Sequence, residues 1–220
     1  MSPSNIRKIA LIDYGAGNVR SASRALAAAA DAIDLEADIL LTTKPEDILS
    51  ATHIILPGVG HYADCMRGLL AQDGLKEALE DAVLNTQTPF LGICVGMQLL
   101  ASLGLEDGET RGLNWIPGVV ERIQPEDAAL PVPHMGWNEI YIQDHPVFDG
   151  IGPSPHVYFT HSYAMTPEEP DHIIASCEYG GSIIAAVACD NIVGVQFHPE
   201  KSQKLGQKIL SNFLNWSPEK

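Results

Sequence analysis

The sequence predicts an α/β fold, with an open, mostly parallel sheet flanked by helices and additional antiparallel strands in the second half. In the first half, short apolar runs alternate with segments of helical apolar spacing, a pattern typical of parallel strands covered on both faces. From Gly112 to about Gln196, β-rich runs are separated by Gly, Pro, Asn and Asp, which favours hairpins. The 220 residues, 45% of them hydrophobic, suit one domain spanning 1–220.

The elements of the first half follow in a regular order. Its strands are rich in Ile and Leu, and glycine-rich turns follow the first and the third of them. Pro45 suits the first turn of a helix, and the long helical stretch after the third strand is expected to break near Gly74. We expect strands at 7–13, 38–43, 52–60 and 88–94, and helices at 19–32, 44–50, 64–85 and 95–103.

The second half contains mainly strands. The segment Cys189–Gly194 has the residues of a hairpin turn, and the last segment has the apolar spacing of an amphipathic closing helix. We expect strands at 118–123, 138–142, 156–164, 172–179, 182–190 and 192–197, and a helix at 202–216.

Composition excludes several classes of function. The net charge of −15 and the pI of about 4.7 disfavour nucleic acid as a partner. No apolar stretch approaches the roughly 18 residues of a membrane span, and residues 1–15 lack the features of a signal peptide. The four cysteines have neither zinc-site nor disulfide-scaffold spacing, and the histidines show no ligand spacing. We therefore expect a cytoplasmic protein that needs no metal or other cofactor and binds neither membrane nor nucleic acid.

One cysteine stands in a distinctive turn. Cys94 ends an apolar run within Gly92–Gly96, directly before helix-forming residues. This is the layout of a nucleophile elbow, in which a sharp strand-to-helix turn lifts the side chain above the sheet and the helix N-terminus favours a thiolate. The alternative is a small apolar core residue, which is our interpretation of the other three cysteines.

A thiol nucleophile needs a base, and His198 with Glu200 supplies one. The two are separated by Pro199, so in an extended segment both side chains point to one side. His198 would move protons while Glu200 orients its ring. The alternative is a structural histidine beside a surface glutamate. A zinc deaminase site, which also contains H-x-E, is excluded because no cysteine follows Cys189.

Backbone donors for an oxyanion are expected at the glycine-rich end of the third strand. The N–H groups around Val59, between two glycines, and that of Val95 on the elbow would stabilise a tetrahedral intermediate. The competing interpretation is dinucleotide binding, because Gly58, Gly60 and Ala63 fit G-x-G-x-x-A after a strand.

Three motifs, "LPGVG", "GICVGMQLL" and "GVQFHPEKS", together resemble those of the class I (triad) glutamine amidotransferases, which have a flavodoxin-like fold. The resemblance covers essentially the whole chain, in the family's order. "DYGAGN", "HMGWN" and "YFTHSY" narrow it to the branch formed by the glutaminase subunits of imidazole glycerol phosphate synthase in histidine biosynthesis.

The resemblance implies that Cys94, His198 and Glu200 form a triad that hydrolyses L-glutamine, and that the Gly58–Val59 peptide reorients to form the oxyanion hole. It further implies glutamine binding by Gly60, Gln98, Glu106 and the backbone around Ser162, and contacts with a partner by Asn18, Tyr158 and Lys201. Without the resemblance, Gln98 and Glu106 would be interpreted as solvated helix residues.

A departure from the family pattern follows the "PGVG" segment. His61 and Tyr62 stand where a small residue and an aromatic, then glycine, are usual, and we interpret His61 as a polar loop residue.

The length of the chain is used up by this domain, so we expect the acceptor of ammonia on another chain. In the histidine enzyme that chain is a TIM-barrel cyclase, which forms a heterodimer with the glutaminase. The alternatives are the glutaminase subunit of another synthase, a γ-glutamyl hydrolase, or a non-catalytic regulatory relative. The intact triad argues against the last of these.

Overall fold

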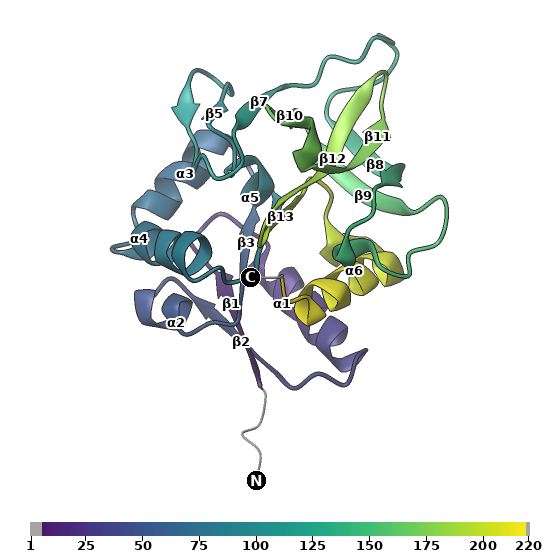
Figure 1. Ribbon diagram of the computed structural model, residues 1–220. Coiled ribbons are helices and arrows are strands. Elements are labelled where there is room, and N and C mark those ends of the chain that lie inside the picture. Colours follow the sequence, from purple (N-terminus) through teal and green to yellow (C-terminus); the bar gives the residue numbers. More distant parts are fainter. Residues whose placement is uncertain (1–5, 219–220) are drawn as a thin grey trace.

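The central sheet of the computed structural model, which describes residues 6–218, has nine strands within that range (Figure 1). Their order is β2-β1-β3-β4-β13-β12-β11-β8-β9, and the first five of these are parallel. The parallel strands are β1 (Arg7–Ile12), β2 (Ala37–Thr42), β3 (His53–Gly58), β4 (Phe90–Cys94) and β13 (Ile192–Val195). This confirms the predicted parallel first half.

The remaining strands of the central sheet are antiparallel, as predicted for the second half. They are β12 (Ser182–Cys189), β11 (Ile173–Glu178), β8 (His134–Ile142) and β9 (His156–His161). A smaller sheet, with four strands in the described part of the chain, contains β10 (Tyr163–Pro167), β7 (Gly118–Arg122), β5 (Leu103–Gly104) and β6 (Thr110–Arg111).

Helices cover both faces of the parallel strands (Figure 1). Helices α1 (Val19–Asp31) and α6 (Gln203–Asn215) pack together on one side. On the other lie α2 (Pro45–Leu49), α3 (Tyr62–Leu70) and α4 (Leu75–Glu80), and the break between the last two falls at Gly74, as predicted. Single helical turns are Asp81–Asn85, Pro146–Phe148, Pro170–His172 and Pro199–Lys201.

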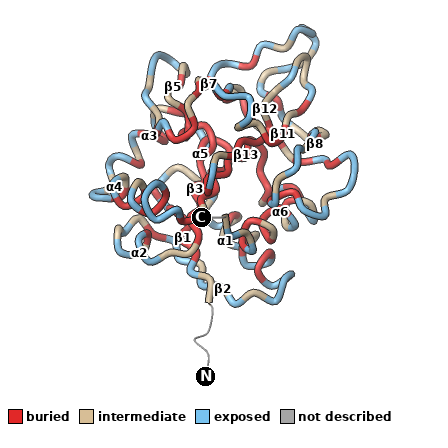
Figure 2. The backbone as a smooth tube through the Cα atoms, in the orientation of Figure 1, coloured by how far each residue is buried: buried red, intermediate tan, exposed pale blue. Residues whose placement is uncertain are grey.

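Burial is greatest along the middle parallel strands (Figure 2). Every residue of β3 and β4 is buried, whereas the edge strand β2 is mostly exposed or half-buried. A strand covered on both faces must be apolar throughout, which is why the sequence of β3 and β4 lacks the alternation of a half-exposed strand. These two strands form the rigid base of the site.

Two elements differ from their predictions. The helix expected at 95–103 ends at Gln98, as α5 (Val95–Gln98), because the carbonyls of Leu99, Leu100 and Ala101 accept hydrogen bonds from the N–H groups of residues 113–116 instead of continuing the helix. The strand expected at 156–164 is divided at Ser162, where β9 leaves the central sheet and β10 joins the smaller one. The ends of the proposed domain, residues 1–5 and 219–220, lie outside the described residues.

Candidate functional site

Cys94 lies at the carboxyl end of β4, and its backbone has the conformation of a sharp elbow. It is the N-cap of α5 with φ 54° and ψ −112°, outside the regions that non-glycine residues prefer. Helix α5 turns back so closely over β3 that a Cβ on Gly96 would lie 1.9 Å from the Leu56 carbonyl oxygen. The turn predicted from the flanking glycines is therefore confirmed. Cys94 as a whole residue is 3% exposed.

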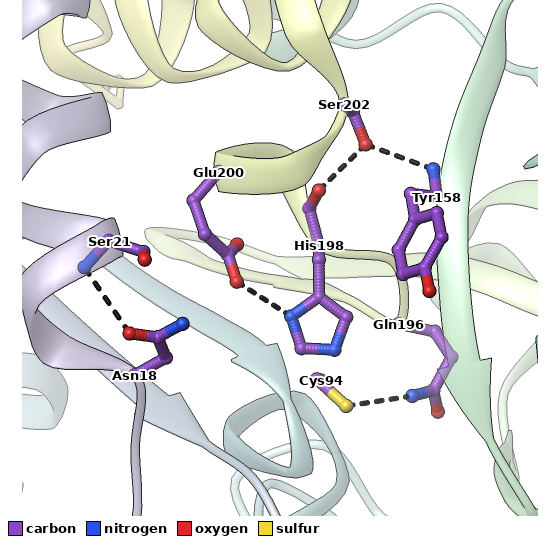
Figure 3. Close-up of polar contacts among 8 residues, drawn as sticks. All are labelled: Asn18, Ser21, Cys94, Tyr158, Gln196, His198, Glu200 and Ser202. Carbon is purple, nitrogen blue, oxygen red and sulfur yellow. Dashed lines mark hydrogen bonds and ion pairs between the residues drawn. The ribbon is translucent and has the colours of Figure 1, made fainter. Parts of the chain in front are cut away.

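The proposed base, His198, comes from the segment after β13, the strand that lies next to β4 in the sheet. Strand β13 pairs in parallel with β4, with Val195 opposite Ile93, so the residues just after both strands meet at one sheet edge. His198 Nδ1 lies 2.7 Å from Glu200 Oε1, and Figure 3 shows Cys94 on the other side of the imidazole. The extended geometry expected for these residues is wrong, because Pro199–Lys201 is a 3₁₀ turn. The two side chains nevertheless meet.

The surroundings of His198 favour its protonated form. Burial lowers its pKa, but the neighbouring Cys94 sulfur and the Glu200 carboxylate, which is bonded to Nδ1, outweigh that effect and raise the pKa to about 9. The side chains of His198 and Glu200 are 1% and 5% exposed. At neutral pH the imidazole therefore holds a proton next to the Cys94 sulfur, where a leaving group could take it.

Gln196 is a site residue that the sequence interpretation missed. Its Nε2 donates to Cys94 Sγ over 3.7 Å, and its Oε1 accepts from Gln98 Nε2 at 2.9 Å (Figure 3 shows the first contact). The signal was its place two residues before His198, since alternate residues of an extended strand share one side.

A cavity of about 510 Å³ opens over the thiol. Of the predicted site residues, all but Glu200 and Tyr158 line it. Glu200 contacts His198, and Tyr158 contacts Lys201, which does line the cavity. The residues predicted from distant segments of the sequence therefore lie together around one cavity.

The proposed glutamine-binding residues are held firmly. Gln98 is 3% exposed, so the alternative of a solvated helix residue is wrong for it. Its Nε2 donates to the Tyr163 carbonyl at 2.9 Å as well as to Gln196. Glu106 Oε2 accepts from the backbone N–H of Tyr62 at 2.7 Å, at the start of α3. The Ser162 carbonyl accepts from Ile123, and Gly60 has a φ of +97°.

The oxyanion loop, defined here as Gly58–Gly60, does not present its central N–H group to the cavity. The Val59 N–H donates to the Ala16 carbonyl at 3.2 Å, and the Cys65 thiol donates to the Val59 carbonyl at 3.4 Å. Val95 is the first residue of α5, where backbone N–H groups have no intrahelical acceptor. One of the two predicted donors is thus engaged elsewhere.

Comparison with known proteins identifies the family. Residues 10–216 match the family model described as glutamine amidotransferase class-I. The chain belongs to this family. Its relatives include the proteins named imidazole glycerol phosphate synthase subunit HisH from Rhodospirillum rubrum, 51% identical over 213 residues (96% of this chain, 100% of that one), and from Brucella abortus strain 2308, 50% identical over 215 residues (96% and 100%).

Solved structures show the same fold at low identity. A crystal structure described as a glutamine amidotransferase superposes with a TM-score of 0.69 at 18% identity, covering 94% of this chain and 97% of that one. A putative GMP synthase subunit from Thermoplasma acidophilum superposes with a TM-score of 0.65 at 18% identity, covering 95% and 92%. The predicted fold class is confirmed.

The residues predicted to face a partner lie near this amidotransferase cavity. Asn18 caps α1 and lines the cavity, as does Lys201, whose Nζ lies 5.7 Å from the centre of the Tyr158 ring. The Tyr158 backbone is fixed by Ser202 Oγ and the His198 N–H. This geometry joins the three residues to the triad segment.

The other reactive side chains have structural surroundings. Cys65 and Cys177 are buried, and burial raises the pKa of Cys65 to about 11 and that of Cys177 to about 12. Cys189 is only half-buried, so the core interpretation does not fully hold for it. His61 Nε2 lies 3.3 Å from Asp107 in the loop after β5, and His61 does not line the cavity. Within residues 6–218, no group of three His, Cys, Asp or Glu is arranged to hold a metal.

Proposed function

We propose that this amidotransferase is the glutaminase subunit of an imidazole glycerol phosphate synthase. The observation that carries the proposal is the Cys94 elbow beside a buried His198 that is bonded to Glu200 at 2.7 Å. The full-length relatives in Rhodospirillum rubrum and Brucella abortus, which bear the name of that synthase subunit, support the choice of substrate and partner.

In the proposed reaction, the Cys94 sulfur attacks the side-chain amide carbon of L-glutamine and a C–S bond forms. The electrons of the C=O bond move to the oxygen, which needs backbone donors. His198 gives its proton to the amide nitrogen, and the C–N bond breaks as the C=O bond re-forms. Ammonia departs, and a thioester between Cys94 and the glutamyl group remains. Water then attacks the thioester carbon while His198 takes a proton from it. The C–S bond breaks, glutamate leaves, and the triad returns to its first state.

Each neighbouring residue has a role that its contacts support. Glu200 keeps the proton-bearing imidazole oriented toward Cys94. Gln98, Glu106, Gly60 and the Ser162 backbone would hold the amino-acid part of glutamine. Val59 and Val95 would stabilise the oxyanion, with Val59 doing so only after its N–H leaves the Ala16 carbonyl. The bond to Ala16 therefore corresponds to a resting state.

The partner in this proposal is a separate TIM-barrel cyclase subunit, which forms a heterodimer with the 1–220 domain. The cyclase joins ammonia to a phosphorylated ribulosyl aminoimidazole carboxamide nucleotide and yields imidazole glycerol phosphate and aminoimidazole carboxamide ribotide. Asn18, Tyr158 and Lys201 would face it. Passing ammonia directly between the subunits keeps it unprotonated and nucleophilic.

We expect the synthase reaction to occur in the cytoplasm. Within the described residues, no helix has both the length and the apolar character needed to cross a membrane.

The test is synthesis from glutamine by purified subunits. The chain is mixed with a histidine-pathway cyclase and its nucleotide, and in parallel with the acceptor subunit of another amidotransferase synthase. We expect a stable complex and imidazole glycerol phosphate in the first mixture only. Glutamine-dependent product in the second mixture alone would assign the chain to the other synthase, and no glutamine hydrolysis in either would favour a regulatory relative.

A further inference from the structure

Two buried histidines opposite the triad are unused by the reaction described above. His134 on β8 and His161 on β9 are cross-strand neighbours, and His134 Nδ1 lies 3.0 Å from His161 Nε2. His134 is 2% and His161 6% exposed. His134 is stacked against the rings of Phe159 and Tyr179, with centroids 4.6 and 4.0 Å away. Such packing holds its ring in one orientation.

The other hydrogen-bond partners of the two histidines determine which ring donates in the bond between them. His161 Nδ1 lies 2.8 Å from the Tyr163 carbonyl, which only accepts, so Nδ1 carries the hydrogen. In a neutral ring Nε2 is then an acceptor, and His134 Nδ1 must donate to it. His134 Nε2 in turn accepts from Asn138 Nδ2 at 3.2 Å. Burial lowers the pKa of each histidine to about 4, which agrees with two neutral rings.

The chain of hydrogen bonds continues to the nucleophile. The Tyr163 carbonyl that accepts from His161 also accepts from Gln98 Nε2 at 2.9 Å. The second hydrogen of that nitrogen goes to Gln196 Oε1, and Gln196 Nε2 donates to Cys94. Both hydrogens of Gln98 Nε2 are thereby used in hydrogen bonds, so the side-chain amide cannot flip by 180° without losing two of them.

We propose that His134 and His161 are positioning residues for glutamine binding. Together they hold the Tyr163 carbonyl at the cavity wall, and this carbonyl fixes the orientation of the Gln98 amide. The inference deepens the proposed function and rests on it. Neither histidine reaches the reacting atoms in this role, so the effect falls on the binding of glutamine more than on the chemical step.

The first experiment compares His134→Leu with His134→Asn in the complex with the cyclase. Leucine removes the donor to His161, whereas the Asn Nδ2 replaces His134 Nδ1. We expect His134→Leu to raise KM for glutamine about tenfold and to lower kcat less than threefold. His134→Asn should recover KM to within about threefold of wild type. Synthesis from ammonium salt should be the same in all three proteins, because it does not use the glutamine cavity.

The matched control is His53→Leu. His53 is also fully buried, with its pKa lowered to about 4 by burial, and like His134 it does not line the cavity. It lies at the start of β3 with Nε2 3.3 Å from the Trp216 carbonyl, so it has no link to the Tyr163 carbonyl or to Gln98. It should lower the unfolding temperature as much as His134→Leu without raising KM. Equal KM values for His134→Leu and wild type, or an equal rise for His53→Leu, would overturn the inference.

A second measurement needs no variant. ¹⁵N-histidine spectra of the wild-type complex at pH 7 should show both His134 and His161 as neutral rings with the hydrogen on Nδ1. An Nε2–H form or a charged ring at either position would overturn the inference even if the leucine variant did not fold. If the wild-type complex does not hydrolyse glutamine, the proposed function fails instead, and this spectrum still reports whether the hydrogen-bonded pair exists.

Discussion

The two sides of the cavity are in different states of readiness. On the triad side, His198 and Glu200 are already bonded at 2.7 Å, and their side chains are 1% and 5% exposed. On the other side, the oxyanion loop is exposed at Val59, which is 39% accessible, and its N–H is bonded to the Ala16 carbonyl. The groups that move protons are assembled, whereas a group that would stabilise developing charge is not. We therefore expect a partner to control the rate through the oxyanion loop, whose central N–H is engaged, and not through the triad, which is already assembled.

The prediction with the largest expected effect removes the nucleophile from the triad side of the cavity. Cys94→Ala should lower glutamine hydrolysis at least about 10⁴-fold, because the nucleophile is lost while the pocket remains. The same complex should still make product from ammonium salt. Both rates are measured on one preparation, with Cys189→Ala as a control that removes a half-buried thiol elsewhere. Substantial hydrolysis by Cys94→Ala would contradict the nucleophile assignment.

The next test completes the unassembled side. Binding of the cyclase with its nucleotide should raise kcat for glutamine hydrolysis about a hundredfold, since one missing oxyanion donor costs about 3 kcal/mol. The NMR signal of the Val59 amide should shift as its bond to Ala16 breaks. A fully active isolated chain, or stimulation with an unchanged Val59 signal, would show that the loop is not the switch.

Acidification should destabilise the protein through the buried histidines outside the triad, because their pKa values are lowered whereas that of His198 is raised. Burial lowers the pKa of His53, His134 and His161 to about 4, against 6.5 for an unfolded histidine. Between these values the unfolded chain binds more protons, so stability is full above pH 6.5 and falls as the pH drops toward 4. Each histidine contributes a slope of at most about 1.4 kcal/mol per pH unit.

Urea unfolding at several pH values measures this slope. His53→Leu should lower the free energy of unfolding at pH 7 but reduce its loss on acidification. If the variant and wild type lose stability in parallel between pH 6.5 and 4, His53 is not held neutral by the fold.

The smallest effect concerns the link between the two sides and the partner. Lys201→Ala should lower the ratio of stimulated to basal glutaminase about threefold, because a solvated cation over Tyr158 contributes under about 1 kcal/mol. The control is Lys204→Ala, an exposed lysine on α6 that does not line the cavity. Equal ratios in the two variants would remove Lys201 from the activation mechanism.

Local sequence was sufficient where local geometry decides the structure. The elbow at Cys94 follows from the close approach of Gly96 to β3, and the strand-and-helix order follows from apolar spacing. The early end of α5 could not be predicted, because it depends on hydrogen bonds from residues 113–116, which no helical pattern reveals. The division of 156–164 at Ser162 likewise depends on which sheet each half joins.

The same distinction applies to the site. The elbow pattern selected Cys94, and the His-Pro-Glu segment selected His198 and Glu200, although the extended conformation expected for that segment was wrong. His134 and His161 showed no ligand spacing, because their contact arises from the pairing of β8 with β9. Gln196 was accessible to the same parity argument that was applied to His198. What escaped prediction was the acceptor of the Val59 N–H, a backbone atom of the loop after β1.

The pairing of β4 with β13 also bears on when the enzyme is expected to become active during its synthesis. Gln196, beside the base, contacts the thiol across a sequence separation of 102 residues. At about 5 to 20 residues per second, a ribosome needs about 5 to 20 s to add that stretch. Throughout that time the thiol has no proton donor beside it, and strand pairing across such a distance is slow once the chain is released. We therefore expect ammonia release to begin late in the maturation of the chain, only after β13, its last strand in chain order, has entered the sheet.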